Sequence, residues 1–256
     1  MNTYNSNATY YNQYQKEQVV NEVKRSKIYI FFALALALTG IIAFSIPYLY
    51  ESALENNNIR LYNLLLTLSF VGSFIVLLPI SIYMSVSVSR NREYKSPILM
   101  GVLFAIYAAF LGLMIGTILY AVMQSGGIET IRLVSYAFLI TAGVFLLCGV
   151  IGTLSKDMSP AISIVSSLSI GAIGLLILNI FLQSSLVSWV LSFAFLLFIL
   201  VITAYDFHMI NRIAGRSSFG NPTITALYCA FSIYTDFIVI FIRVLYFLLL
   251  LVGNKK

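Results

Sequence analysis

The chain has 256 residues, of which 60% are hydrophobic and 9% are charged, and its formal net charge is +6. An ordinary soluble domain is about half apolar and about one-quarter charged, so this composition excludes a water-soluble globular protein. The positive charge falls in loops and termini, where it serves membrane topology and does not indicate a nucleic-acid partner.

Residues 1–15 are rich in Asn, Tyr and Gln, and we expect residues 1–27 to form a disordered cytoplasmic tail. Apolar blocks of about 20 residues follow, the length that a helix needs to cross a bilayer. They predict an all-α membrane domain over residues 28–252 and a short C-terminal tail over 253–256. The first block lacks a signal-peptide cleavage site, so we expect it to be retained. The predicted spans are 28–50, 61–88, 98–123, 134–153, 161–182, 187–210 and 224–252.

Polar sequences separate the spans, such as ENNN at 55–58 and SKDMSP at 155–160. Pro79 predicts a kink in the long second span. Gly112 and Gly116 form a GxxxG pattern, which is typical of close helix packing. Trp189, Tyr48 and Tyr50 are typical of aromatic residues at the membrane interface.

The distribution of Lys and Arg predicts the orientation. The tail and the loops after spans two, four and six hold ten of them, and the opposite side holds four. Because cytoplasmic loops are enriched in Lys and Arg, the N-terminus is expected in the cytoplasm. The tail carries no organelle signal and favours a bacterial plasma membrane over the alternative, an endoplasmic reticulum membrane.

Asp206, Asp236 and Arg243 are the charged residues well inside the predicted spans. A charge at the bilayer centre costs about 2.5–3.5 kcal/mol, so such residues usually face a partner or a wet cavity. Asp206 lies near the cytoplasmic end of span six, and Asp236 lies about three turns into span seven from the same side. The alternative interpretation is a polar contact that locks the helices together.

Two facing carboxylates cannot both ionise cheaply, because two charges 4 Å apart repel by roughly 4 kcal/mol at an effective dielectric of 20. Asp206 and Asp236 together are therefore a candidate proton sensor. When deprotonated they also form a hard oxygen site that suits a transient Ca²⁺ ion.

Arg90 and Arg92 lie at the cytoplasmic end of span two, at a depth comparable with Asp206. Each fits the positive-inside pattern, and either one could reach inward to neutralise Asp206 as a breakable gate. Arg243 is expected to snorkel outward or to pair with backbone carbonyls. We interpret His208 as an interfacial residue. Cys148 and Cys229 lie inside spans and predict neither a disulfide nor a metal site.

Two stretches of the second half carry a family resemblance. ITAYDFHMI at 202–210 and LYCAFSIYTDFIVIFIRVLYFLL at 227–249 resemble the Bax inhibitor-1 family, in which span six ends in Tyr-Asp and span seven carries a Tyr-x-Asp-Phe-Ile motif. The segment 137–159, with Gly152, Thr153 and Lys156-Asp157, is also similar to the family.

The resemblance implies six spans around a central seventh and a proton-sensitive calcium leak controlled by two aspartates. These aspartates match Asp206 and Asp236 here. It also implies an arginine latch onto the aspartate of span six, for which Arg90 and Arg92 are the candidates, with Arg90 preferred because it lies nearer the membrane. The implied partners are the lipid bilayer, Ca²⁺ and H⁺, with Ca²⁺ as a transported ion and no resident cofactor.

Two other classes of protein compete with this interpretation. An intramembrane aspartyl protease also pairs Tyr-Asp with a second aspartate, but that aspartate lies in a Gly-x-Gly-Asp motif and a Pro-Ala-Leu follows. Neither motif occurs here, so we expect no enzymatic activity. A non-conducting membrane regulator of stress or cell-death signalling, acting through protein partners, is the other alternative.

Overall fold

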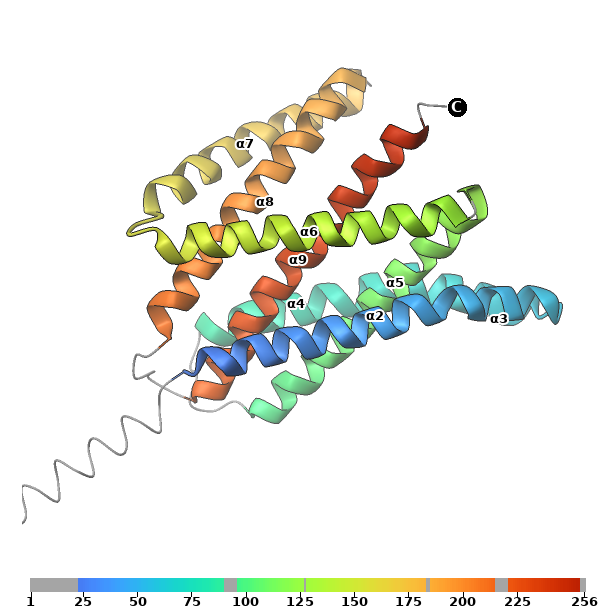
Figure 1. The fold of residues 1–256 in the computed structure, drawn as a ribbon, viewed down its shortest axis with the longest axis horizontal. Coiled ribbons are helices and arrows are strands. Elements are labelled where there is room, and N and C mark those ends of the chain that lie inside the picture. The colour runs from blue at the N-terminus through green and yellow to red at the C-terminus, as the bar shows by residue number, and fades with distance from the viewer. Residues whose placement is uncertain (1–22, 90–95, 127, 183–184, 215–220, 254–256) are drawn as a thin grey trace, which may run out of the picture. The chain divides into compact units, whose positions relative to one another are not determined.

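The structure is a computed structural model that describes residues 23–89, 96–126, 128–182, 185–214 and 221–253. All regular secondary structure in these ranges is helical (Figure 1). The elements are α2 (Arg25–Glu55), α3 (Ile59–Thr67), the π-helix η1 (Leu68–Gly72), α4 (Ser73–Ser89), α5 (Pro97–Gly126), α6 (Ile128–Leu154), α7 (Ser159–Leu182), α8 (Ser185–Ile213) and α9 (Pro222–Gly253).

Seven helical stretches among the described residues are long and apolar enough to cross a membrane, which confirms the seven predicted spans. The second span consists of α3, η1 and α4 in succession, and each other span is a single helix. The first helix begins at Arg25, slightly before the predicted residue 28, and α8 runs on to Ile213, beyond the predicted residue 210. The predicted tail over 1–27 lies mostly outside the described residues, as do residues 254–256.

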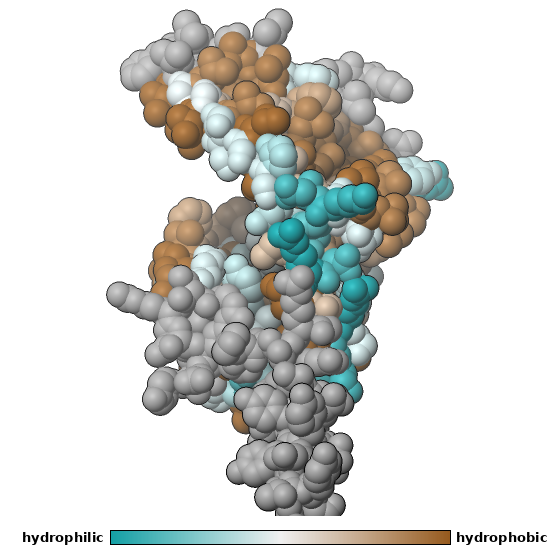
Figure 2. Space-filling model, turned by 90° about the vertical axis from the view of Figure 1, so that its left-hand side faces the viewer, coloured by the Kyte–Doolittle hydropathy of each residue, from teal (hydrophilic) through white to brown (hydrophobic). Residues whose placement is uncertain are grey.

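The helices present apolar side chains to their surroundings. Hydrophobic side chains cover much of the coloured surface in Figure 2. Leu34, Phe74, Ile98, Leu146 and Ile170 have exposed fractions of 62% to 77%. Water does not stabilise such a surface, whereas lipid chains do, and a helix pairs most of its backbone polar groups internally.

Polar side chains mark the ends of helices at the predicted breaks. Asn57 has a φ of 49°, in the left-handed region that Asn tolerates better than most residues. The Asn58 side chain accepts a hydrogen bond of 3.1 Å from the backbone N–H of Leu61 and caps α3. Before α7, Asp157 Oδ1 accepts hydrogen bonds from the Ser159 backbone N–H at 3.0 Å and from its hydroxyl at 2.8 Å.

The irregularity of the second span lies at η1, ahead of the predicted kink residue. Pro79 lies inside α4, and the π-helix occupies Leu68–Gly72. A π-bulge inserts one residue into the helical repeat and so changes which side chains face a neighbouring helix. Here it accompanies a fully buried hydroxyl, Ser69, whose Oγ accepts a 2.7 Å hydrogen bond from Thr117 on α5.

The described helices fall into two compact units, and residues 1–124 with 212–231 form the first. In this unit α2 and α5 pack closely at Gly112 and Gly116. A Cβ atom added to these glycines would lie 2.9 Å from the carbonyl oxygen of Thr39 and 2.8 Å from that of Ala43, respectively. The interpretation of this pair as a packing surface is thus consistent with the structure.

Tyr50 lies in the interior of the first unit. Its side chain is fully buried, its ring stacks on Tyr120 with the centroids 4.6 Å apart, and its hydroxyl lies 3.2 Å from Thr117 Oγ1. The interfacial interpretation of Tyr50 was therefore wrong, because the hydroxyl finds a protein partner instead of the headgroup region. Tyr48 and Trp189, by contrast, are 73% and 56% exposed.

Residues 125–211 with 232–256 form the second unit, and its tightest contact joins α6 to α8. A Cβ atom on Gly152 would lie 2.1 Å from the carbonyl oxygen of Ala204. Beside it, His208 Nδ1 lies 3.3 Å from the carbonyl oxygen of Gly152, and Asn211 donates a 3.3 Å hydrogen bond to that of Thr153.

The last helix, α9, contributes to both units, with residues up to Phe231 in the first and residues from Ser232 in the second. It is the most buried of the seven spans, with 50% of its most apolar window buried against 11% for α7. High burial is what a central seventh span requires. The arrangement of six spans around it stays a prediction.

Candidate functional site

Helices α8 and α9 run antiparallel within the second unit, and four contacts follow one register. From one end of the pair to the other, the contacts join Trp189 to Phe247, Phe195 to Arg243, Thr203 to Asp236, and Asp206 to Ser232. Residue numbers rise along α8 as they fall along α9. This register brings the two candidate aspartates to within about one helical turn of each other along the helix axes.

Asp206 is held by a hydroxyl of the opposite helix. The Ser232 Oγ–H donates a hydrogen bond to Asp206 Oδ2. The Asp206 side chain is half-buried, and Ser232 lies one helical turn before Asp236 on the same face of α9. The residue that holds one aspartate is therefore a neighbour of the other.

Asp236 is the more deeply buried carboxylate, with 6% of its surface exposed. The Thr203 side chain of α8 interacts with it, and Thr203 lies one turn before Asp206. The Oδ2 atom of Asp236 is buried without a hydrogen-bond partner among the described residues. Burying a carboxylate oxygen without a partner is costly and is tolerated where function requires it.

The four residues form two crossed pairs, each made of one hydroxyl and one carboxylate. Thr203 and Asp206 are three residues apart on α8, and Ser232 and Asp236 are four residues apart on α9. At 1.5 Å per residue, the two carboxylates are offset along the helices by about 5 Å, roughly one turn. The Asp206 charge acts directly on Asp236 across this offset.

Helix α6 forms an aromatic wall beside the acidic pair. Phe145 packs edge-on against Phe207 of α8 and Phe237 of α9, with ring centroids 5.0 Å and 5.3 Å apart. Cys148, one turn further along α6, is buried and close enough to Asp236 to interact with it electrostatically. Apolar rings and a thiol thus surround the inner carboxylate, which strengthens electrostatic interactions there by lowering the local polarity.

The described residues contain no group of three or more His, Cys, Asp or Glu side chains that could hold a metal ion. Asp206 and Asp236 alone offer up to four carboxylate oxygens, whereas Ca²⁺ takes six to eight oxygen ligands. Such a pair suits a passing ion that keeps part of its water shell.

The remaining candidates have different outcomes. Arg90 and Arg92 lie outside the described residues, so the latch stays a prediction. Arg243 is half-buried and places its guanidinium 5.8 Å from the centre of the Phe195 ring. His208 is 4% exposed and lies against α6, so its interpretation as an interfacial residue was wrong.

The sequence analysis did not identify Ser232 and Thr203 as site residues, although their spacing from the aspartates is a signal for them. Each lies on the same helix face as an aspartate, at a spacing of four or three residues. Hydroxyl residues are common inside membrane spans, where they usually bond to their own backbone, so this spacing alone does not distinguish them. Only the register of α8 against α9 shows that each serves the opposite carboxylate.

These features define the class of protein: a multi-pass α-helical membrane protein with a buried pair of carboxylates on its last two spans. The family described as "Inhibitor of apoptosis-promoting Bax1" matches residues 20–252. The chain belongs to the Bax inhibitor-1 family.

Several bacterial proteins are similar to this chain over most of its length. An uncharacterized membrane protein of Streptococcus pyogenes serotype M3 is 29% identical over 86% of this chain and 89% of its own. An uncharacterized protein of Rickettsia prowazekii is 28% identical, covering 90% and 89%. One of Deinococcus radiodurans is 28% identical, covering 90% of each chain. No solved structure matches significantly.

Proposed function

We propose that the protein is a pH-sensitive calcium leak, in which Asp206 and Asp236 sense protons and line the cation path. The observation that carries the proposal is the buried Oδ2 of Asp236, which has no hydrogen-bond partner among the described residues and lies beside a second carboxylate. Such an atom is stable when it is protonated, hydrated or bound to a cation, and each of these states depends on pH. The protein acts as a transporter and not as an enzyme.

Thr203 supplies a way for the site to respond to a proton. Its Oγ1 lies 2.7 Å from the carbonyl oxygen of Ile199 and also interacts with Asp236. A hydroxyl has one proton to donate and can accept as well. With Asp236 ionised, Thr203 donates to the carboxylate. With Asp236 protonated, the carboxyl group donates to Thr203, which then donates to Ile199.

Asp206 connects the pair to the proposed latch. It is half-buried near the end of α8 and keeps one oxygen, Oδ2, on Ser232. Its other oxygen is the proposed acceptor for Arg90 or Arg92, whose charge would hold α8 in a closed state. Protonation of Asp206 would release the arginine and would also weaken the attraction for Ca²⁺, two effects of opposite sign on flux.

The proposed setting is a bacterial plasma membrane with the N-terminus in the cytoplasm. The bacterial sources of the similar proteins support the membrane, and the distribution of Lys and Arg supports the orientation. Ca²⁺ and H⁺ are then the partners that cross or titrate the site from the two aqueous sides.

Calcium entry into proteoliposomes, measured across a pH series, tests the proposal. Asn resembles a protonated carboxyl group in shape and charge, so Asp206→Asn and Asp236→Asn should each flatten the pH dependence of flux. Glu55→Gln removes an exposed carboxylate at the end of α2 and is the matched control. Well-folded wild type without pH-dependent flux would reject the leak and favour a non-conducting regulator.

A further inference from the structure

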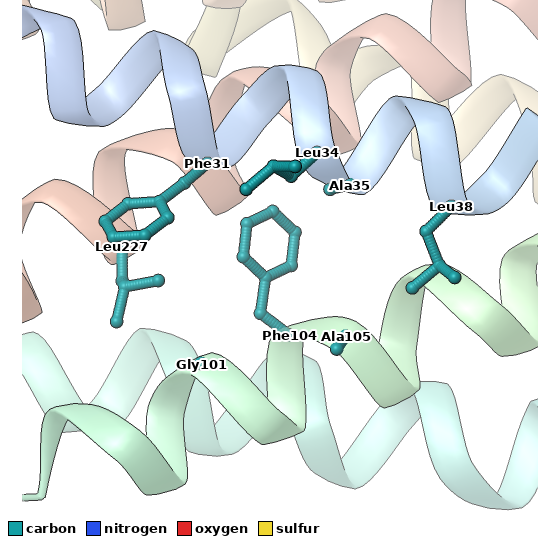
Figure 3. Close-up of a pocket in the computed structure, with 8 residues that line it drawn as sticks. All are labelled: Phe31, Leu34, Ala35, Leu38, Gly101, Phe104, Ala105 and Leu227. Atoms are coloured by element: carbon teal, nitrogen blue, oxygen red, sulfur yellow. The ribbon is translucent and has the colours of Figure 1, made fainter.

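The first unit contains an apolar pocket that the acidic site does not use. It has a volume of about 220 Å³ and is lined by Phe31, Leu34, Ala35, Leu38, Gly101, Phe104, Ala105 and Leu227. Figure 3 shows that side chains of α2, α5 and α9 surround it, with the Phe104 ring between α2 and α5. Apolar cavities of about 150 Å³ take up benzene-sized molecules and stay dry, so this pocket suits a segment of hydrocarbon chain.

The pocket is partly open to the outside of the first unit. Leu34 on its rim is 62% exposed, and the neighbouring Ile30 is 55% exposed. In a membrane, an outward-facing apolar hollow of this kind is filled by acyl chains. The pocket is deep because Gly101 has no side chain and Ala105 has only a methyl group, so little fills the space on this face of α5.

Positive charge lies one to two turns from the pocket. Lys24 and Lys27 are exposed at the start of α2, and Lys27 precedes Phe31 by four residues, about 6 Å along the helix. The described acidic residues of this unit are Glu51 and Glu55, at the other end of α2, about 36 Å from Lys27. Within the described part of the unit, no carboxylate balances the two lysines at this end.

We infer that this face of the first unit is a binding site for an anionic glycerophospholipid. One acyl chain occupies the pocket, and the phosphate lies among the lysines at the start of α2. The apolar pocket suits a lipid tail better than a peptide or a metal ion, and the exposed Lys24 and Lys27 favour a negatively charged headgroup. A lipid bound here would bridge α2, α5 and α9, the three helices that supply the lining.

The chain offers a matched pair of substitutions for a test. A Cβ atom on Gly101 would have no heavy atom within 4 Å, so the side chain of Gly101→Leu would begin in open space on the lining of the pocket. A Cβ atom on Gly40 of α2 is equally unobstructed, and Gly40 does not line the pocket. Gly40→Leu is therefore the control, and Ala105→Leu is a second pocket-filling variant should Gly101→Leu fold poorly.

The measurement is native mass spectrometry of the full chain, equilibrated with phosphatidylglycerol or with phosphatidylcholine of the same acyl chains. Wild type and Gly40→Leu should retain phosphatidylglycerol, and Gly101→Leu should lose it. The double variant Lys24→Gln/Lys27→Gln should bind it more weakly by about fivefold per lysine, which corresponds to ~1 kcal/mol for each cation near an anionic headgroup. Its binding of phosphatidylcholine should not change.

Three results would overturn the inference. Equal retention by Gly101→Leu and Gly40→Leu would place the lipid elsewhere. Equal binding of the two lipids by wild type would reduce the site to a non-selective hydrocarbon contact. A dimer mass that disappears in Gly101→Leu, with no lipid adduct in wild type, would make a second copy of the chain the occupant of the pocket.

Discussion

Ser232 donates its hydroxyl hydrogen to Asp206 from a position one helical turn before Asp236. The two carboxylates are therefore connected through the packing of α8 on α9 as well as through their charges. A movement of α8 relative to α9 that breaks the Ser232 hydrogen bond also changes the distance between Thr203 and Asp236, because both contacts belong to one antiparallel register. Under the proposed function, we therefore expect a change of protonation at this site to shift α8 relative to α9.

The first prediction concerns this register. Ser232→Ala removes the hydrogen bond to Asp206 and should change the pH midpoint of calcium flux while leaving some pH dependence, because both carboxylates remain. The loss of one hydrogen bond to a charged group costs about 1.5–3 kcal/mol, which corresponds to about one to two pH units of midpoint. Ser166→Ala is the control, since the Ser166 hydroxyl bonds only to the backbone oxygen of Ile162 in the described structure. An unchanged midpoint in Ser232→Ala would contradict the assigned role.

A second prediction concerns the stability of the inner carboxylate. Asp236→Asn removes a buried carboxylate whose Oδ2 lacks a described partner, so we expect the variant to unfold at a higher temperature than wild type at alkaline pH, where the wild-type carboxylate is ionised. The gain should be about 1–3 kcal/mol, the usual cost of an unsatisfied buried polar group. It should shrink on acidification, since protonation removes the same charge from wild type. A variant that is less stable than wild type at alkaline pH would show that the ionised carboxylate has a compensating partner.

Thr203 allows a third prediction, which separates proton sensing from packing. Thr203→Val keeps the shape of the side chain and removes the hydroxyl that interacts with Asp236. We expect the pH dependence of flux to become shallower and the melting temperature to change little, because the Ile199 carbonyl keeps its helical hydrogen bond. Thr153→Val is the matched control, as the Thr153 hydroxyl bonds to carbonyl oxygens of its own helix, α6.

The fold was largely predictable because lipid acts as a simple solvent. Uninterrupted apolar blocks must form helices that cross it, and polar breaks such as ENNN must lie outside it. The π-helix at Leu68–Gly72 was not predictable, since its position depends on the contact between Ser69 and Thr117, which are 48 residues apart. The location of the Tyr50 side chain was predicted wrongly for a similar reason. A tyrosine ring is stable both at the membrane interface and in a buried stack, and its place here depends on the positions of Tyr120 and Thr117.

Asp206 and Asp236 could be predicted as site residues because a carboxylate in a span carries a large cost, whatever surrounds it. Their hydroxyl partners could not, because Ser and Thr cost little in a helix and occur in most of the spans. The register between α8 and α9, which pairs Thr203 with Asp236 and Ser232 with Asp206, depends on side-chain packing along the whole length of both helices. A single sequence does not encode it in any local pattern.

A fourth prediction concerns three glycines of α6 that differ in their surroundings. Gly152→Ala places a methyl group 2.1 Å from the carbonyl oxygen of Ala204 and should destabilise the protein by about 1–3 kcal/mol, as overpacking does. Gly149→Ala meets the Phe207 ring at an ordinary 3.4 Å, and Gly143→Ala meets nothing within 4 Å. Both should be neutral or slightly stabilising through helix propensity. Thermal unfolding of the three variants in one detergent provides the comparison, and a tolerated Gly152→Ala would contradict the close crossing of α6 and α8.

The last prediction separates His208 from the proton sensor. A carbonyl can only accept a hydrogen bond, so the 3.3 Å contact with Gly152 requires the proton on Nδ1, and Nε2 is left without a described partner. Two residues along a helix correspond to a rotation of about 200°, which turns His208 away from Asp206 and toward α6.

His208→Asn keeps a donor near the position of Nδ1 and should unfold close to the wild-type temperature, whereas His208→Phe should unfold at a lower temperature. Both variants should retain the wild-type pH midpoint of calcium flux, because neither changes the groups around Asp206 and Asp236. A shifted midpoint in His208→Asn, with unchanged stability, would make His208 part of the proton path and would extend the sensor from α9 through α8 to α6.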